Sequence, residues 1–371
     1  MRSGPGDGGR MMGDERFFLP GPTQVRPEVL EAMCHPMISH RSAAMELLMR
    51  TIHGRLHPLF GTARPVYVVG GSATAAMEMA VRCGSIDRVL ALVCGAFGER
   101  FAEIAELTGR DVTRVIAEPG ETVSPEQVRL ALEHGTYDTV TVVHSETSTG
   151  ALSDVAGIAR VVHEASSAML LVDGVTSVGA MPVEMDAWGA DLVFTGSQKA
   201  LALPPGLAFV AASERLLNRA RGLFDRGYAL DLARYDDFWH KAQSPTTPPI
   251  PLLYALDRQL ADIELEGLGA RFERHARMAR ACWDWAEGLP NAGLGVDVLA
   301  RDGARSPTVT CLLCDHPEAV VRTLNEQGYV IGPGHDELRK TTVRVGHMGD
   351  HTVQGLEVLL DVMGRVIRAL R

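Results

Sequence analysis

The stretch Asp191 to Pro205, DLVFTGSQKALALPP, decides the fold and places one lysine where lysines seldom occur. The apolar run Leu192 to Phe194 predicts a short buried strand, and Gly196 ends this strand in a polar turn that leads to Lys199. A lysine between a buried strand and an apolar, proline-ended segment loses hydration, which lowers its pKa and frees a nucleophilic amine. Such an amine forms Schiff bases, for example with pyridoxal phosphate (PLP). Taken alone, Lys199 also fits a surface lysine in a turn.

Segments typical of strands alternate with helical segments from Pro65 onward. The expected strands are Val66 to Val69, Arg88 to Val93, Asp111 to Ile116, Thr139 to Val143, Ala168 to Val172, Asp191 to Phe194 and, as an edge strand, Leu207 to Ala212. This alternation predicts an α/β fold in which helices cover both faces of a mostly parallel sheet. In such folds ligands bind outside the carboxyl ends of the strands.

Length and composition predict two domains after a short tail. A chain of 371 residues with 46% hydrophobic residues exceeds the size at which one core stops growing. We expect a disordered, glycine-rich tail at 1–15 and a large domain at 16–266 that begins with an extended arm at 16–30. Residues 267–371 are expected to form a smaller C-terminal α+β domain.

Charge and cysteine content narrow the class of protein. A net charge of −10 argues against a nucleic-acid or anionic-membrane surface. No apolar run is long enough to span a bilayer, so we expect a soluble protein, and the cysteine usage fits reducing, cytoplasmic conditions. The six cysteines have neither metal-ligand spacing nor disulfide density, and Cys311 and Cys314 are interpreted as core residues. His53 and His57 have the spacing of a zinc pair, but no glutamate accompanies them, so no metal is expected.

Two features are predicted to lie near Lys199 at the same edge of the sheet. Asp173 ends the strand Ala168 to Val172, and its carboxylate could pair with a protonated ring nitrogen of a flat cofactor. It could equally cap a turn before Gly174. The small residues Gly71 to Thr74 open a helix whose free N–H groups favour an anion such as a phosphate. A turn that only packs a helix closely against a strand is the alternative.

Four more residues occupy positions suited to a site. Phe97 follows a strand and could lie on a cofactor ring, with Val175 on the opposite face. Thr147, after another strand, offers a hydroxyl at the same sheet edge. Arg344 is a lone cation on an apolar strand, and its guanidinium suits a carboxylate, although a structural ion pair would also explain it. His144 is interpreted as a core histidine.

Read together, these segments resemble the class V aminotransferases of the type I PLP fold, most closely the alanine–glyoxylate and serine–glyoxylate (serine–pyruvate) aminotransferase group. The resemblance covers nearly the whole chain from Phe18 onward. It rests on LPGPT (Leu19 to Thr23), HRS (His40 to Ser42), GGSATAAME (Gly70 to Glu78), HSETSTG (His144 to Gly150), LLVDGVTSVG (Leu170 to Gly179), TGSQKALALPPGLAFV and RVGHMG. It implies a large domain with a mostly parallel seven-stranded sheet flanked by helices, plus the smaller domain.

The resemblance also implies a role for each candidate residue. Lys199 would hold PLP as a Schiff base, Asp173 would pair with the ring nitrogen, and both would be catalytic. Cofactor-binding residues would be Ser72, Ala73, Thr74 and Gln198 near the phosphate, Phe97 and Val175 on the two ring faces, Thr147 at the ring hydroxyl or substrate, and Thr247. Thr247 would reach the phosphate from the neighbouring subunit of a homodimer with a shared site. Arg344 would bind the substrate carboxylate, with Gly21 and Thr147 also contacting substrate.

The sequence departs from the family pattern in several places. Phe97 stands where the mammalian enzymes often carry a tryptophan, which would weaken stacking on the ring. Ser244 replaces a tyrosine that precedes the phosphate-reaching threonine, and the glycine-rich turn is GGSAT instead of GSGT. The loop Gly332 to Thr342 carries acidic and basic residues near the expected substrate mouth, which leaves the substrate open.

The resemblance implies ping-pong transamination from a small amino acid, alanine or serine, to a 2-oxo acid, glyoxylate or pyruvate. No second arginine matches a distal-carboxylate site, which favours monocarboxylic donors. An aminotransferase for phosphonate or other substrates is an alternative. A PLP-dependent lyase of the same fold is another, although such enzymes typically have a histidine where Gln198 stands. A non-catalytic PLP-sensing regulator would need a helix-turn-helix segment that this sequence lacks.

Overall fold

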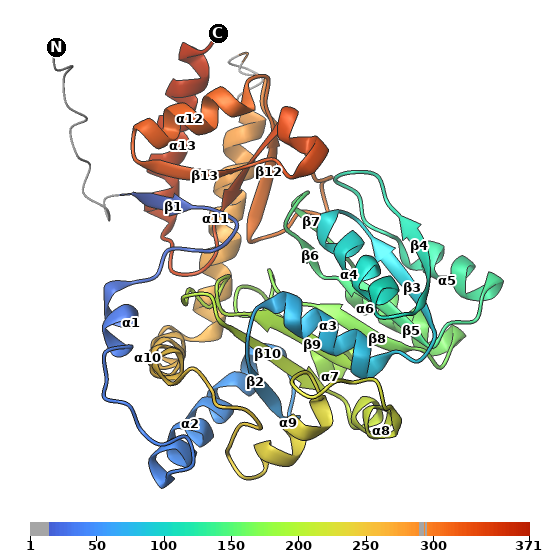
Figure 1. Ribbon diagram of the computed structural model, residues 1–371. Helices are drawn as coiled ribbons and strands as arrows, with labels where there is room; N and C mark the ends of the chain where they lie inside the picture. Colours follow the sequence, from blue (N-terminus) through green and yellow to red (C-terminus); the bar gives the residue numbers. More distant parts are fainter. Residues whose placement is uncertain (1–14, 289–292, 294) are drawn as a thin grey trace, which may run out of the picture.

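The computed structural model describes residues 15–288, 293 and 295–371. The expected tail, residues 1–15, lies outside the described residues except for Glu15. The strands form a sheet of seven, a sheet of five and a two-stranded ribbon. The five-stranded sheet lies above the seven-stranded one in Figure 1.

The seven-stranded sheet confirms the predicted α/β fold. Its strand order is β2-β10-β9-β8-β5-β3-β4, and every pairing is parallel except the two made by β10. The strands are β2 (Val66–Gly70), β3 (Arg88–Val93), β4 (Asp111–Ile116), β5 (Thr139–Val143), β8 (Met169–Asp173), β9 (Leu192–Gly196) and β10 (Leu207–Ala212).

The prediction that Leu207 to Ala212 forms an edge strand is wrong. β10 lies between β2 and β9 and pairs antiparallel with both, so β2 is the edge strand. All six side chains of β10 are buried. An unbroken apolar run is typical of a strand that is covered on both faces and flanked on both sides, and this was the signal for a central position.

Helices cover both faces of this sheet, each over its own apolar core. One core joins the sheet to α3, α4, α8 and α9, with Met79, Phe101 and Leu216 among its members. The other includes Ile52 and Leu253 from helices on the opposite face. The helices of this part are α1 (Pro27–Ala32), α2 (Ala43–Phe60), α3 (Ala73–Gly84), α4 (Ala96–Leu107), α5 (Pro125–His134), α6 (Val155–Ala165), α7 (Met185–Trp188), α8 (Glu214–Gly222), α9 (Leu232–Trp239) and α10 (Ile250–Glu266).

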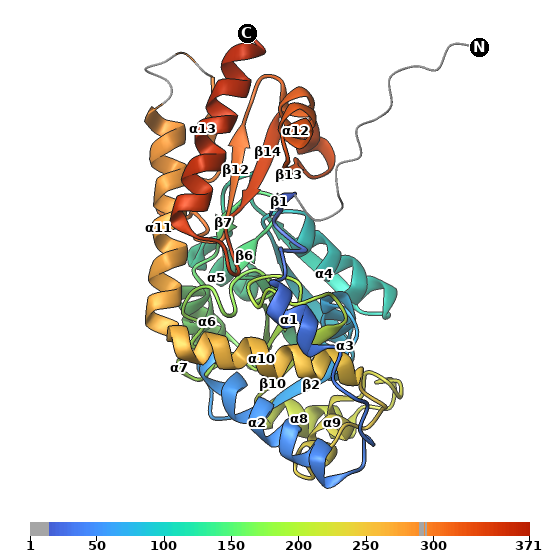
Figure 2. The same cartoon turned by 90° about the vertical axis from the view of Figure 1, so that its left-hand side faces the viewer.

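The five-stranded sheet has the order β1-β13-β14-β12-β11 and a separate apolar core. Its strands are β1 (Arg16–Phe18), β11 (Asp297–Val298), β12 (Val309–Leu313), β13 (Tyr329–Pro333) and β14 (Thr342–Gly346). Its helices are α11 (Leu268–Gly288), α12 (Pro317–Glu326) and α13 (Val353–Ala369), with the 3-10 helix η2 (Asp336–Lys340) before β14. Figure 2 shows α11 running alongside both parts of the molecule. The expected domain division after Glu266 falls where α10 ends, and it stays a prediction.

The N-terminal arm lies on its own chain. Its first residues form β1, which pairs parallel with β13 of the small sheet. Further along, Arg26 forms ion pairs of 2.7 Å with Asp262 of α10 and with Asp350 in the loop after β14. The fully buried Arg271 of α11 also reaches Asp350, at 3.2 Å. This network joins the arm, two long helices and the loop that follows the RVGHMG segment.

Candidate active site

Several of the predicted residues meet where strands of the large sheet end. Asp173 is the last residue of β8, and Lys199 follows β9 after a short turn. Phe97 lies in the first turn of α4, directly after β3. Thr147 follows β6 (Ser145–Glu146), which pairs with β7 (Ala151–Leu152) beyond β5. This convergence is the arrangement that the strand–helix alternation predicts.

Lys199 is buried, with 7% of its surface exposed. Its Nζ donates hydrogen bonds to the carbonyl oxygen of Pro20 and, at 3.4 Å, to Thr147 Oγ1. Burial, helped by the positive charge of Arg344, lowers the pKa of Lys199 from 10.5 to about 8. A neutral, nucleophilic amine is therefore accessible near neutral pH, as the sequence predicts.

Gly21 belongs to the site because its backbone lies against the lysine side chain. A Cβ on Gly21 would lie 2.6 Å from Lys199 Cδ and 3.0 Å from Nζ. The backbone of Gly21 also has a φ of +122°, a conformation that L side chains rarely adopt. Any larger residue here would displace the lysine, which explains why the arm carries glycine at this position.

Asp173 is a buried carboxyl group with 3% of its surface exposed. Its Oδ1 accepts a hydrogen bond of 2.8 Å from the Val175 backbone N–H. Burial, together with the nearby Glu146, raises the pKa of Asp173 from 3.8 to about 7, while the charge of Lys199 opposes this rise. A further positive charge beside Asp173 would lower its pKa again and keep the carboxylate fully ionised at neutral pH.

Phe97 and Val175, the two residues predicted to flank a cofactor ring, each lie next to one of the two central residues of the site. The centre of the Phe97 ring lies 5.7 Å from Lys199 Nζ and 4.8 Å from the guanidinium carbon of Arg100. Val175 is half-buried and follows Asp173 by two residues. Thr195 Oγ1 donates to the Val175 carbonyl at 3.2 Å, which holds this segment against β9.

Arg344 is a half-buried cation that has only carbonyl partners among the described residues. Its Nε donates to the Pro333 carbonyl at 2.9 Å, and one terminal nitrogen donates to the Thr147 carbonyl at 3.2 Å. Burial lowers the pKa of Arg344. A guanidinium has five N–H donors, so donors remain for an incoming anion. Thr147 contacts Arg344 through its carbonyl and Lys199 through its hydroxyl.

The start of α3 offers an anion site of the predicted kind. Ser72 precedes the helix, and its side chain makes no capping bond. The first turn of α3 carries no acidic residue, so its free N–H groups and dipole are uncompensated. Ala73 is buried and Thr74 exposed at this turn, and a Cβ on Gly196 would meet both Ala73 Cβ and the side-chain oxygen of Gln198. Gln198 therefore lies beside the helix start.

Thr247 lies at the surface of the single chain, away from the strand ends that carry Lys199 and Asp173. It is exposed, in the segment between α9 and α10. Ser244, three residues earlier, is buried, and its carbonyl accepts a hydrogen bond of 2.9 Å from Arg41. Arg41 belongs to the HRS motif, so this motif anchors the segment that carries Thr247.

Sequence reasoning missed Glu146, the most buried carboxylate near the site. It is 0% exposed and accepts hydrogen bonds from the backbone N–H groups of Phe97, Gly98 and Ser148. The available signal was a carboxylate within HSETSTG, next to a buried strand, where an unpaired charge is costly.

The other histidines and cysteines that the sequence singled out are packing residues. His144 is buried, bonds Ser177 Oγ at 3.0 Å and packs edge-on against Trp188, and burial lowers its pKa to about 4. His53 stacks on Trp239. Cys311 and Cys314 are buried free thiols.

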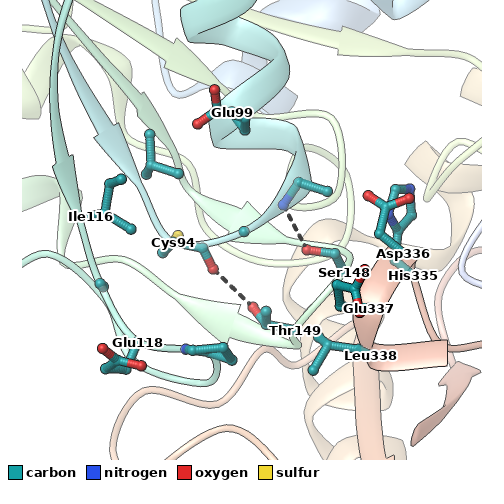
Figure 3. Close-up of a pocket in the computed structure, with 15 residues that line it drawn as sticks. Cys94, Glu99, Ile116, Glu118, Ser148, Thr149, His335, Asp336, Glu337 and Leu338 are labelled. Atoms are coloured by element: carbon teal, nitrogen blue, oxygen red, sulfur yellow. Dashed lines mark hydrogen bonds and ion pairs between the residues drawn. The ribbon is translucent and has the colours of Figure 1, made fainter. Parts of the chain in front are cut away.

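A cavity of about 370 Å³ lies between the ends of β3 and β4 and the 3-10 helix η2 (Figure 3). His335 lines it and also contacts the Phe97 ring, with 5.8 Å between ring centres. Its other polar lining residues are Glu99, Glu118, Ser148, Thr149, Asp336 and Glu337. The cavity therefore adjoins the site and has a mainly acidic rim.

These residues fit PLP on the observations above. The start of α3 provides uncompensated N–H groups for a phosphate, and Asp173 is a buried carboxyl group that a cationic ring nitrogen would ionise. Lys199 supplies the amine between them, and Phe97 supplies an aromatic face.

The comparison with known proteins identifies the family of the chain. Residues 17–349 match the aminotransferase class-V family, so the chain belongs to that family of PLP-dependent transferases. An alanine–glyoxylate aminotransferase from Nostoc sp. has the same type I fold, with a TM-score of 0.89, 31% identity and coverage of 99% of this chain and 98% of that one.

Several relatives show which members of the family are similar. An uncharacterized aminotransferase from Methanocaldococcus jannaschii is 37% identical, over 90% of this chain and 87% of that protein. The serine–glyoxylate aminotransferase of Methylorubrum extorquens and the L-aspartate–glyoxylate aminotransferase of Paracoccus denitrificans are each 32% identical, over 92% of this chain and 88% of theirs.

None of the helices in the described ranges is long and apolar enough to cross a bilayer.

Proposed function

We propose that the protein transfers the amino group of a small amino acid, alanine or serine, to a 2-oxo acid, glyoxylate or pyruvate. One observation carries this proposal: Thr147 joins the buried Lys199 amine to the Arg344 guanidinium, which has no carboxylate partner among the described residues. The carboxylate of an amino acid held by Arg344 would place its amino group and α-carbon near Lys199.

The side chains divide the work of this reaction. Lys199 would bind PLP and, once freed, carry the proton away from the substrate α-carbon. Asp173 would hold a proton on the ring nitrogen, and Ser72, Ala73, Thr74 and Gln198 would hold the phosphate. When bound, PLP draws electrons from the bonds at the α-carbon. Phe97 and Val175 would fix the ring plane and keep water from its faces.

A donor screen tests the proposed activity. Purified protein loaded with PLP would be mixed with one amino acid at a time, and the visible absorbance of the cofactor followed. Loss of this absorbance with alanine or serine, and production of the matching 2-oxo acid, would support the proposal. Reaction with cysteine alone and release of sulfide would instead support a lyase of the same fold, although Gln198 argues against one. A phosphonate donor would support the related aminotransferase.

The acidic rim beside Phe97 favours a monocarboxylic donor over aspartate. Asp336 and Glu337 line the cavity. The negative charge of Asp336 also attracts the Arg344 guanidinium and acts to raise its pKa. The basic residues of η2, Arg339 and Lys340, are outside the lining. A second substrate carboxylate would therefore approach like charges, which slows its association.

We expect the double variant Asp336→Asn/Glu337→Gln to raise kcat/KM for aspartate, relative to alanine, about three- to tenfold at low ionic strength, with a smaller gain in high salt. The control is Glu357→Gln/Asp361→Asn, which makes the same change in net charge at exposed positions of α13. An aspartate-to-alanine ratio that stays constant in the rim variant would refute this explanation of donor choice.

We propose a homodimer in which Thr247 completes the neighbouring site. The exposed position of Thr247 supports this, as do the exposed apolar side chains Met37, Leu47, Phe224 and Tyr228. Large exposed apolar side chains are common at subunit interfaces. A reducing compartment such as the cytoplasm suits the six free cysteines.

Subunit mixing tests the shared site. Lys199→Ala and Thr247→Glu, the latter repelling a phosphate, are each expected to be nearly inactive as homodimers. Unfolding and refolding them together should restore about a quarter of the wild-type activity. Random pairing makes about half of the dimers mixed, and one of the two sites in each mixed dimer has neither change. The control mixes Lys199→Ala with itself. Failure to regain activity, with mixed dimers verified by mass, would place Thr247 outside the neighbouring site.

A further inference from the structure

Glu146 is a carboxylate that the proposed reaction does not use. It lies on β6 with no exposed surface, one residue before Thr147. Its Oε2 accepts backbone N–H bonds from Phe97 and Gly98, both 3.1 Å. Its Oε1 accepts from the Ser148 backbone N–H at 2.9 Å and the Ser148 hydroxyl at 2.6 Å. All four partners donate, so the ionised carboxylate, which only accepts, fits this position.

These bonds fasten two separate parts of the site together. Phe97 and Gly98 lie in the first turn of α4, whereas Thr147 and Ser148 lie beyond β6. The approach is close, because a Cβ on Gly95 would lie 2.5 Å from Glu146 Cγ. The ring that faces Lys199 and the hydroxyl that accepts its hydrogen bond are therefore held by one side chain.

The charge of Glu146 has no cation within ion-pair distance in the described part of the chain. The cations of the site are the buried Lys199 and the half-buried Arg344, and Asp173 is the other buried carboxyl group. Glu146 acts on all three through space: it raises the pKa of Lys199 and Asp173, and its attraction also raises that of Arg344. Glu146 thus adds a negative charge to that of ionised Asp173, and together these two carboxylates balance the positive charges of Lys199 and Arg344.

We propose that Glu146 is a positioning residue: it fixes Phe97 and Thr147 around the Lys199 amine and balances the buried positive charge that Arg344 brings to the site. This inference rests on the proposed function. It extends that function by assigning two tasks to one buried carboxylate: balancing the charges of Lys199 and Arg344, and holding Phe97 and Thr147 in place.

The test uses the small number of lysines in this protein. Lys199, Lys241 and Lys340 are the three lysines of the whole chain, and the last two are exposed. In cofactor-free protein with 13C-labelled lysine, the Lys199 signal can be assigned from Lys199→Arg and titrated. Glu146→Gln keeps the size of the side chain and removes its charge, so the Lys199 pKa should fall below its value of about 8. PLP affinity, measured separately by protein fluorescence, should weaken about tenfold or more.

Two matched variants separate charge from position. Glu146→Asp keeps the charge but shortens the reach, and Ser148→Ala removes one hydrogen bond and no charge. Both should weaken PLP binding and leave the Lys199 titration unchanged, and they remain informative if Glu146→Gln does not fold. A Lys199 titration that is the same in Glu146→Gln and wild type, or PLP affinity unaltered in all three variants, would overturn the inference. If the wild type itself binds no PLP, the proposed function fails instead.

Discussion

Lys199→Ala is expected to lower kcat/KM for alanine with glyoxylate by at least about 10⁴-fold, because one change removes both the amine that binds the cofactor and the group that moves the proton. Among the described residues, Lys199 Nζ contacts Pro20, Thr147 and Phe97, and none of these has an amine that could replace it. The measurement is steady-state kinetics, together with the visible absorbance of the protein after addition of PLP. That absorbance should be lost in the variant.

The matched control is Lys241→Ala, which removes an exposed lysine after α9. It should retain both activity and absorbance. Lys199→Arg should be as inactive as Lys199→Ala, because a guanidinium stays protonated and forms no Schiff base. Substantial activity in either Lys199 variant would exclude this residue as the nucleophile.

Asp173→Asn is expected to lower kcat about 10²- to 10³-fold, the equivalent of roughly 3–4 kcal/mol for a buried charge that loses its partner. The amide keeps the shape of the carboxyl group but cannot hold a proton on a ring nitrogen. Kinetics with saturating PLP would measure this loss.

Although Asp173→Asn should lower kcat, it should make the cofactor-free protein more stable at neutral pH. The folded-state pKa of Asp173, about 7, lies above 3.8, the ordinary pKa of an aspartate side chain. Wild-type protein therefore loses stability as pH rises from about 4 to 7, because the folded state holds a proton that the unfolded state releases. The asparagine variant lacks this loss, so at pH 7 and above it should melt at a higher temperature than cofactor-free wild type.

Asp191→Asn provides the contrasting control. Asp191 is also a buried carboxylate, but it precedes β9, at the far end from Lys199, and pairs with Arg215. Its replacement should lower the melting temperature and leave kcat nearly unchanged. Equal behaviour of the two variants in both measurements would mean that Asp173 has only a structural role.

The sequence predicted those parts of the fold and site that depend on local patterns. The alternation of apolar strands and helices predicted the sheet, and residues after strand ends, such as Asp173 and Lys199, were predicted to meet because parallel strands end at one edge. The apolar sequence around Lys199 and Arg344 likewise predicted that both lose contact with water, because the neighbouring residues in the chain are apolar.

Features that depend on contacts between distant segments were missed. The place of β10 between β2 and β9 depends on how the chain returns after β9, and no residue of β10 specifies its neighbours. The pairing of the arm with β13 joins residues more than 300 positions apart. Glu146 was missed because its partners, Phe97 and Gly98, lie far away in the sequence.

The most direct test of the account is to trap the lysine that binds the cofactor. Protein incubated with PLP would be reduced with borohydride and digested, and the peptides examined by mass spectrometry for the added pyridoxyl phosphate. With three lysines in the chain, the assignment is unambiguous. The account predicts the added mass on the peptide that contains Lys199. The same mass on Lys241 or Lys340 alone, or on no lysine, would contradict it.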